Sequence, residues 1–254
     1  WLKIHIHGVG KFHSGKGWCF SAFILYIVKS PRQPTGAFLF SNFLINICPR
    51  VKRTPNHKTM TQFKITTKYK KLLADTITPV SIYLNIRKRF KNSFLLESSD
   101  YHGNKDSFSF ICFNPMASFK VEDQKISTVF PDGSFKVKSA QENDVITEMK
   151  AFADSFVPDS SVSDFKFITN GLFGFTSFEA VRHFEDIDFT YPEKEEKKVP
   201  DMHYFVFQNI IAINHFKNEA YIFCHSVDGK NNISEIEQLL QSRNIASYKF
   251  SKEG

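Results

Sequence analysis

Two long apolar runs in the last quarter of the chain are separated by a turn of only two residues. The first run covers residues 203–216 and the second covers 219–226, with Lys217 and Asn218 between them. Both runs are rich in β-branched and aromatic residues, which is typical of strands. Because parallel strands need a crossover of a dozen or more residues, a connection this short predicts an antiparallel hairpin.

Strand-like segments joined by short turns recur through the middle of the chain. We expect strands over residues 94–99, 107–113, 117–121, 125–130 and 134–138, the last one after the turn Pro131-Asp132-Gly133. Adjacent strands with such short connections favour an α+β fold with mostly antiparallel sheets and flanking helices, and argue against a doubly wound parallel sheet.

Three helices are predicted among these strands. The first has Thr78 as its N-cap and Pro79 at its first position, where the missing N–H costs nothing, and Val80, Tyr83, Leu84 and Arg87 follow at helical spacing. The second covers about residues 142–156, with Val145, Met149, Phe152 and Phe156 on its apolar face. The third covers residues 233–243 and opens with Asn232 and Glu235 at capping-box spacing.

The first 59 residues differ in charge from the rest of the chain. They hold nine Lys or Arg and no Asp or Glu, so the remaining residues carry 24 of the 33 basic and all 26 acidic side chains. The net charge of +7 therefore belongs to this leader.

Three interpretations of the leader are open: a signal or membrane segment, a basic nucleic-acid arm and a non-native leader. Its two apolar runs, 20–28 and 37–48, are shorter than the roughly 20 residues of a spanning helix. The start at Trp1 and the lack of acids favour the last, so we expect a non-native leader over 1–59 and a domain over 60–254.

No catalytic motif can be identified from the residues alone. Gly171 and Gly174 lack the remaining signature of a phosphate-binding loop, and we expect them instead to allow close backbone approach. Cys112 and Cys224 lie in apolar strands as small hydrophobic residues, and the histidines show no metal-ligand spacing. Four cysteines in 254 residues do not form a disulfide scaffold, which favours a reducing, cytoplasmic compartment.

One predicted strand ends in side chains suited to a zwitterionic ligand. Two leucines at 95 and 96 are followed by Glu97, Ser98 and Ser99. A carboxylate can pair with an ammonium group and hydroxyls can bind a carboxylate, although a strand that simply runs into a polar loop would look the same.

Several segments, in order, resemble the N-terminal region of anthranilate synthase component I. They cover residues 73–84, 94–99, 107–115, 170–185 and 199–202. The family commonly has Arg-Tyr-Ser-Phe-Ile-Gly where this chain has Ser-Phe-Ser-Phe-Ile-Cys at 107–112, so Ser109 and Phe110 keep the pattern as structural or pocket-lining residues. The resemblance implies the N-terminal part of a two-lobed fold, with Glu97 and Ser98 in a site for the feedback inhibitor L-tryptophan.

The resemblance also implies what the complete subunit does. It converts chorismate and ammonia to anthranilate and pyruvate with Mg²⁺, and a glutamine amidotransferase partner, component II, supplies the ammonia. The catalytic residues and Mg²⁺ ligands lie in the family's C-terminal half, so we expect this chain to be a fragment that is inactive alone. The alternatives are a fragment of aminodeoxychorismate synthase component I, a standalone amino-acid-binding module, and a nucleic-acid binder that depends on the basic leader.

Overall fold

The computed structural model describes residues 62–75, 78–97, 107–141, 144–183 and 199–241. The chain divides into two compact units, the first comprising 1–66 with 115–207 and the second 67–114 with 208–254. Strands β4 (Phe108–Glu122) and β9 (Met202–Asn214) contribute residues to both units. The predicted non-native leader, the loop at 100–106 and the charged run at 192–198 lie outside the described residues.

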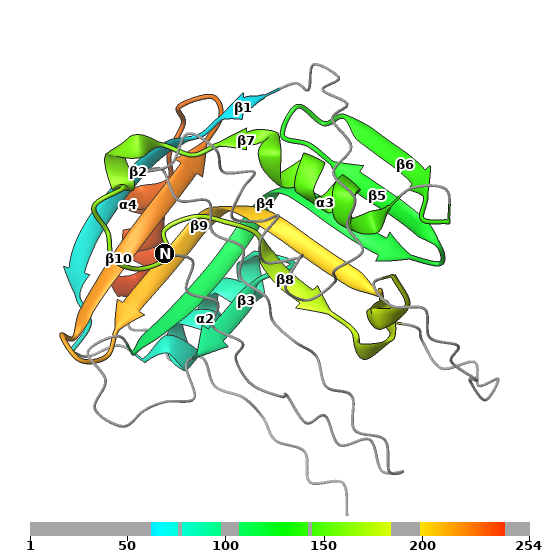
Figure 1. Cartoon of the computed structure of the whole chain (residues 1–254). Helices are drawn as coiled ribbons and strands as arrows, with labels where there is room; N and C mark the ends of the chain where they lie inside the picture. Colours follow the sequence, from blue (N-terminus) through cyan, green and yellow to red (C-terminus); the bar gives the residue numbers. More distant parts are fainter. Residues whose placement is uncertain (1–61, 76–77, 98–106, 142–143, 184–198, 242–254) are drawn as a thin grey trace, which may run out of the picture. The chain divides into compact units, whose positions relative to one another are not determined.

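The sheet is almost entirely antiparallel, as the short turns predict. Its strands follow the order β2-β10-β9-β4-β5-β6, while β3 pairs with β4 and β8 pairs with β9 (Figure 1). These strands are β2 (Thr66–Leu73), β3 (Phe94–Glu97), β5 (Lys125–Val129), β6 (Phe135–Ser139), β8 (Phe173–Thr176) and β10 (Glu219–Ser226). A separate parallel pair joins β1 (Phe63–Lys64) to β7 (Phe156–Val157). The α+β class with mostly antiparallel sheet is therefore confirmed, whereas β1, β2, β7 and β8 were not predicted.

The predicted hairpin is present, with β9 and β10 in antiparallel register. Glu219 lies opposite Asn214 and Cys224 lies opposite Asn209. At the turn, Asn218 adopts a φ of 52°, a left-handed conformation that asparagine tolerates better than most residues. The turn covers residues 215–218, four residues where the sequence predicted two, because β9 ends at Asn214.

The two strands expected at 107–113 and 117–121 form one strand of 15 residues, β4. The sequence between them, Asn114-Pro115, is a strand breaker in isolation. Here Asn114 takes a φ of 58° without ending the strand, and its side-chain Nδ2 donates to Oε1 of Gln208. The strand therefore continues through the predicted break.

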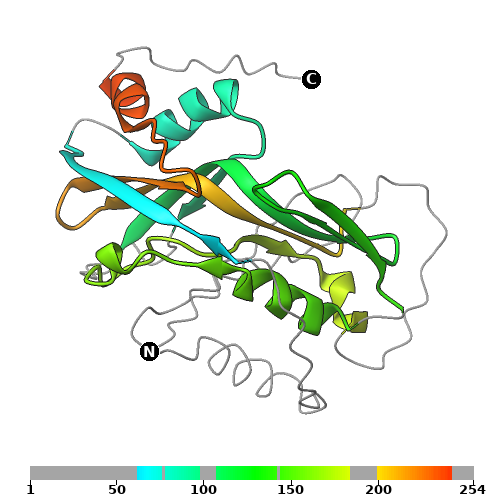
Figure 2. The same ribbon diagram turned by 90° about the horizontal axis from the view of Figure 1, so that it is seen from above.

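In the second unit, two helices cover one face of the strands. Helix α2 (Pro79–Arg89) begins as predicted, since the Thr78 side chain accepts a hydrogen bond from the N–H of Ser81. Its buried residues are Ile82 and Ile86, however, and Val80 is 48% exposed. Helix α4 (Ile233–Gln241) lies on the same side of the strands as α2 (Figure 2). Together they close a core of aliphatic side chains from strands and helices, among them Ile82, Ile86, Ile111, Ile211, Ile213, Ile222, Ile236, Leu239 and Leu240.

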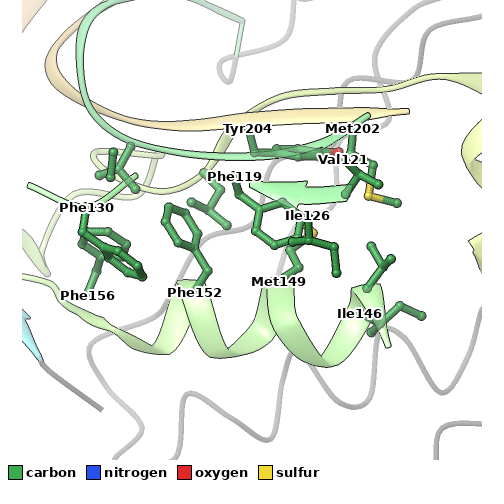
Figure 3. Packing of buried hydrophobic residues seen from close by; sticks show 14 of the residues in the cluster. Phe119, Val121, Ile126, Phe130, Ile146, Met149, Phe152, Phe156, Met202 and Tyr204 are labelled. Carbon is green, nitrogen blue, oxygen red and sulfur yellow. The ribbon is translucent and has the colours of Figure 1, made fainter. Parts of the chain in front are cut away.

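In the first unit, helix α3 (Val145–Asp154) packs on β4, β5 and β9. It is shorter than the predicted segment because the Asp144 side chain caps it and Phe156 belongs to β7. Ile146, Met149 and Phe152 point from the helix toward Phe119 and Ile126 (Figure 3). Stacked and tilted rings of Phe63, Phe130, Phe152 and Phe156 extend this core, with centroids 5.2–6.5 Å apart. None of the described helices is long and apolar enough to cross a membrane.

Candidate functional site

Three polar side chains gather where β3 ends and β4 begins, in the second unit. Glu97 is the last residue of β3 and lies directly opposite Ser109 in the antiparallel register. Cross-strand partners project from the same face of a sheet, so the Glu97 carboxyl and the Ser109 hydroxyl share one face. Ser98, which the sequence analysis placed in the same site, lies outside the described residues.

His215 joins this pair from the turn directly after β9, 106 residues further along the chain than Ser109. Its backbone N–H donates to the carbonyl of Ser107 over 3.0 Å, which anchors the end of β9 beside the start of β4. The ring nitrogen Nε2 lies 2.7 Å from Oγ of Ser109. We call Glu97, Ser109 and His215 the strand-end site.

The three members of the strand-end site differ in exposure. Ser109 is completely buried, His215 is half-buried and Glu97 is exposed. A buried hydroxyl that holds an imidazole fixes the ring, while the exposed carboxylate keeps access to solvent and to a ligand. The arrangement places an exposed carboxylate at the end of β3 and an imidazole held by Ser109 beside the start of β4.

Sequence reasoning did not find His215. The nine histidines have no spacing that marks one of them, and the contact with Ser109 depends on two strands that are far apart in sequence. Ser109 was predicted as a structural or pocket-lining residue, and the structure shows it buried against the ring of His215. No sequence signal other than the position of His215 at the end of a predicted strand could have indicated the pair.

A second charged cluster lies in the first unit, around Asp201. Nη2 of Arg182 lies 2.7 Å from both carboxylate oxygens of Asp201, and Nε2 of His183 lies 2.9 Å from one of them. Burial, the largest single influence, raises the pKa of Asp201, but the hydrogen bonds and charges of His183 and Arg182 together hold this pKa below its usual value. A carboxylate with both oxygens occupied is held in place as a structural anion, and we assign it no catalytic role.

Gly174 does not belong to a phosphate-binding loop. It lies within β8, opposite Tyr204 of β9, and a Cβ at this position would lie 2.0 Å from the carbonyl oxygen of His203. The prediction of close backbone approach is thus confirmed at Gly174. The two described cysteines are also buried as predicted, since Cys112 is completely buried and Cys224 is 1% exposed.

No group of three or more His, Cys, Asp or Glu side chains able to hold a metal is found among the described residues. We therefore assign no Mg²⁺ ligand to the described residues and derive no step through this ion. Fold and site together define an α+β protein with a mostly antiparallel sheet, an exposed acid at the end of β3 and a Ser109–His215 hydrogen bond near the start of β4.

Comparison with known proteins identifies the relatives of this chain. No model of a known protein family matches. Anthranilate synthase component 1 of Lactococcus lactis is 30% identical over 162 residues, which are 61% of this chain and 31% of the relative. The Acinetobacter calcoaceticus protein of the same name is 22% identical over 182 residues, or 71% of this chain and 35% of the relative. The Aquifex aeolicus protein of that name is 27% identical over 153 residues.

The chain is homologous to the N-terminal region, about 30% of the length, of anthranilate synthase component 1. It spans about a third of the length of the curated relatives that it matches. The crystal structure of anthranilate synthase component I from Streptococcus pneumoniae is 20% identical, with a TM-score of 0.39 over 66% of this chain and 34% of that one. This structural likeness is too limited to carry an argument about the site.

Proposed function

We propose that this chain provides the regulatory and scaffolding region of an anthranilate synthase component I. The observation that carries the proposal is the homology to the N-terminal region of several proteins of that name. Under this proposal the complete subunit converts chorismate and ammonia to anthranilate and pyruvate in the cytoplasm. A glutamine amidotransferase partner, component II, delivers the ammonia.

The proposal divides the chemistry between two parts of the relatives' length. The Mg²⁺ ligands and the acid and base residues belong to the two thirds that this chain does not cover, and bound Mg²⁺ would act there as a Lewis acid on chorismate. The residues of this chain would hold that part in place and bind the inhibitor L-tryptophan. We therefore expect the chain alone to form no anthranilate.

Glu97 and Ser98 are the proposed tryptophan-binding residues. The structure supports Glu97 as a candidate, because its carboxylate is exposed at a strand end and can pair with the ligand ammonium. In this role the carboxylate makes a charge-assisted hydrogen bond, and its replacement by an amide keeps the shape but removes the charge.

A chimera tests the proposal. Residues 60–254 replace the corresponding third of the Lactococcus lactis enzyme, and anthranilate formation from chorismate and ammonia is followed by fluorescence. We expect turnover and inhibition by L-tryptophan, with the inhibitory concentration raised about tenfold in Glu97→Gln, which corresponds to about 1.4 kcal/mol, and raised also in Ser98→Ala. Asp228→Asn, an exposed site away from β3, is the matched control and should change neither property.

Each part of the proposal has an outcome that would contradict it. A folded chimera that forms no anthranilate would rule out the scaffolding role, and an active chimera insensitive to tryptophan would rule out the regulatory role. Formation of aminodeoxychorismate instead of anthranilate would identify the alternative enzyme. Anthranilate formation by the 254-residue chain alone would disprove the division of the chemistry.

A further inference from the structure

Asn170 is the one asparagine of the 254-residue sequence that a glycine follows directly. The sequence predicts close backbone approach at Gly171 and Gly174, and the structure shows it at Gly174. A glycine after an asparagine has another consequence, because its backbone nitrogen has no Cβ beside it and can come close to the asparagine side chain. The pair Asn170-Gly171 therefore has a chemistry that the packing of β8 does not use.

The structure brings the nitrogen of Gly171 to the side chain of Asn170. The backbone N–H of Gly171 donates a hydrogen bond to Oδ1 of Asn170 over 2.7 Å. Cγ of Asn170 is bonded directly to Oδ1, so the nitrogen lies beside the carbon that it would attack. Among the residues that the structure describes, no other group forms a hydrogen bond with this side chain, so the amide is free to turn its face toward the nitrogen.

The surroundings of the pair leave access for water. Asn170 and Gly171 are both partly exposed, and they precede β8 and lie outside its register with β9. The next two residues are buried, since Leu172 is 4% exposed and Phe173 is 1% exposed. The reactive pair therefore lies at the border between a solvent-accessible segment and a buried strand.

We propose that Asn170 deamidates spontaneously in the folded protein through a cyclic imide with Gly171. A base from solvent removes the proton of the Gly171 nitrogen, which then forms a bond with Cγ of Asn170. The bond between Cγ and Nδ2 breaks, and Nδ2 takes up a proton from water and leaves as ammonia. Water opens the imide at either of its carbonyl carbons and leaves aspartate or isoaspartate at residue 170. The reaction exchanges an amide nitrogen for a water oxygen, so it needs no oxidant or reductant.

The isoaspartyl product should weaken the pairing of β8 with β9. In isoaspartate the backbone runs through the side-chain carbons, so the chain before Gly171 is longer by one methylene. Strand β8 pairs with β9 from Phe173 to Thr176 (Figure 1). A shift along β9 would bring a residue with a Cβ to the place of Gly174, where fixed backbone leaves no room, so β8 cannot take up the extra length.

Ageing of the purified protein tests the proposal. The 254-residue chain, checked for folding by circular dichroism, is incubated in mildly alkaline buffer with and without urea. Mass spectrometry with electron-transfer fragmentation then separates aspartate from isoaspartate in the peptide that contains residue 170. Asn92, an exposed asparagine followed by Ser93, is the matched control in the same molecule. Two variants block the reaction in different ways: Asn170→Gln requires a larger ring, and Gly171→Ala adds a Cβ beside the attacking nitrogen.

We expect both products at residue 170 of the native protein. They should form at least about tenfold faster than at Asn92, which corresponds to a barrier lower by about 1.4 kcal/mol. The native rate should be at least as high as the rate in urea, because the fold holds the nitrogen at the side chain. Both variants should suppress the reaction. The isoaspartyl fraction, separated by chromatography, should unfold at lower urea than fresh protein, whereas Asn170→Asp, which has the charge without the methylene, should unfold like the wild type.

Three results would overturn the deamidation site: reaction in urea but not in the native protein, equal rates at Asn170 and Asn92, or aspartate without isoaspartate, which excludes the imide. An isoaspartyl fraction as stable as fresh protein would overturn the weakened pairing of β8 with β9. The inference goes beyond the proposed function and does not depend on it, because it involves the folded backbone alone. An inactive chimera would therefore overturn the proposed function and leave the deamidation site standing.

Discussion

Gly174 of β8 lies against the backbone of β9 so closely that a Cβ would come within 2.0 Å of the carbonyl oxygen of His203 and 2.6 Å of Cα of Tyr204. Both contacts involve backbone atoms, which cannot move aside as the end of a flexible side chain can. Glycine is therefore the one residue type that allows β8 and β9 to pair at this register.

Replacement of Gly174 by alanine should separate these two strands. We expect Gly174→Ala to lower the free energy of unfolding by about 3 kcal/mol or more, because the methyl group overlaps fixed backbone. Urea denaturation followed by circular dichroism measures this loss. Gly229→Ala is the matched control, since nothing lies within 4 Å of its Cβ and only its positive φ of 78° opposes the change. The control should cost about 1 kcal/mol, and equal losses would contradict the close approach.

The ion cluster at Asp201 should contribute to stability in a pH-dependent way. Asp201 is 4% exposed but the Arg182 side chain is 34% exposed, so we expect Asp201→Asn to lower the free energy of unfolding at pH 7 by about 2 kcal/mol, because it weakens charge-assisted hydrogen bonds that solvent screens in part. The pKa of Asp201 is lowered in the folded state, so its contribution is present above the pKa of the unfolded carboxyl and is lost as the pH falls through the folded pKa. Urea denaturation at pH 7 and at pH 2 measures the effect. The free energies of unfolding of Asp201→Asn and wild type should differ at pH 7 and approach each other at pH 2.

The control for this cluster is the exposed pair of Asp228 and Lys230, whose side chains are 57% and 85% exposed. Exposed pairs contribute little, so Asp228→Asn should leave the unfolding midpoint unchanged. A loss in this variant as large as that in Asp201→Asn would show that burial is not the reason for the effect.

His203 should lower the stability of the protein in mild acid. Burial, and to a lesser extent the charge of Lys120, lower the pKa of His203 to about 4 from an ordinary value of 6.5. The unfolded chain therefore binds more protons between these pH values, so stability is fully present above pH 6.5 and decreases as the pH falls to 4. Because solvent screens the half-buried ring, we expect the free energy of unfolding to decrease by about 2 kcal/mol.

NMR titration of the His203 ring and denaturation at pH 6.5 and pH 4 measure this decrease. In His203→Gln this part of the pH dependence should be absent, and parallel profiles for variant and wild type would contradict the prediction.

The buried thiols should react slowly in the native protein. Burial raises the pKa of Cys112 well above its ordinary value and also raises that of Cys224. After replacement of Cys19 and Cys48 by serine, we expect modification of Cys112 and Cys224 to be at least about a hundredfold slower than in denaturant. Ser161→Cys supplies an exposed reference thiol that should react rapidly in both conditions. Rapid labelling of Cys112 in the native protein would contradict this prediction and show that β4 opens locally.

Three apolar side chains on one face of β5 and β6 should promote self-association. Val129 and Phe135 are cross-strand partners, and Val129, Phe135 and Val137 are 37%, 61% and 50% exposed. Phe135→Ser should lower the tendency to associate at high salt, with little change in unfolding midpoint, as measured by sedimentation velocity. Val80→Ser, at an isolated exposed valine of α2, is the control and should change association much less.

Local sequence determined the elements whose signals lie within a few residues. Thr78 and Pro79 start α2 because the Thr78 hydroxyl accepts a hydrogen bond from the N–H of Ser81 and Pro79 has no N–H that would need a partner. The turn at Asn218 sets the β9–β10 hairpin in the same way, and short connections of this kind made the antiparallel class predictable. Strand β2 escaped prediction because it is lysine-rich and mostly exposed, with Thr67 as its one buried residue, so its pairing with β10 and not an apolar pattern defines it.

Tertiary structure decided the features that depend on contacts between distant residues. Strand β4 continues through Asn114, despite its positive φ, because partner strands pair with β4 on both sides of this residue, whereas the local sequence indicates a break. Of the candidate site, the sequence indicated Glu97, but His215 meets Ser109 only because β9 returns beside β4 after more than a hundred residues. Periodicity and turn chemistry act over a few residues, while a binding site depends on the register of strands that the whole fold brings together.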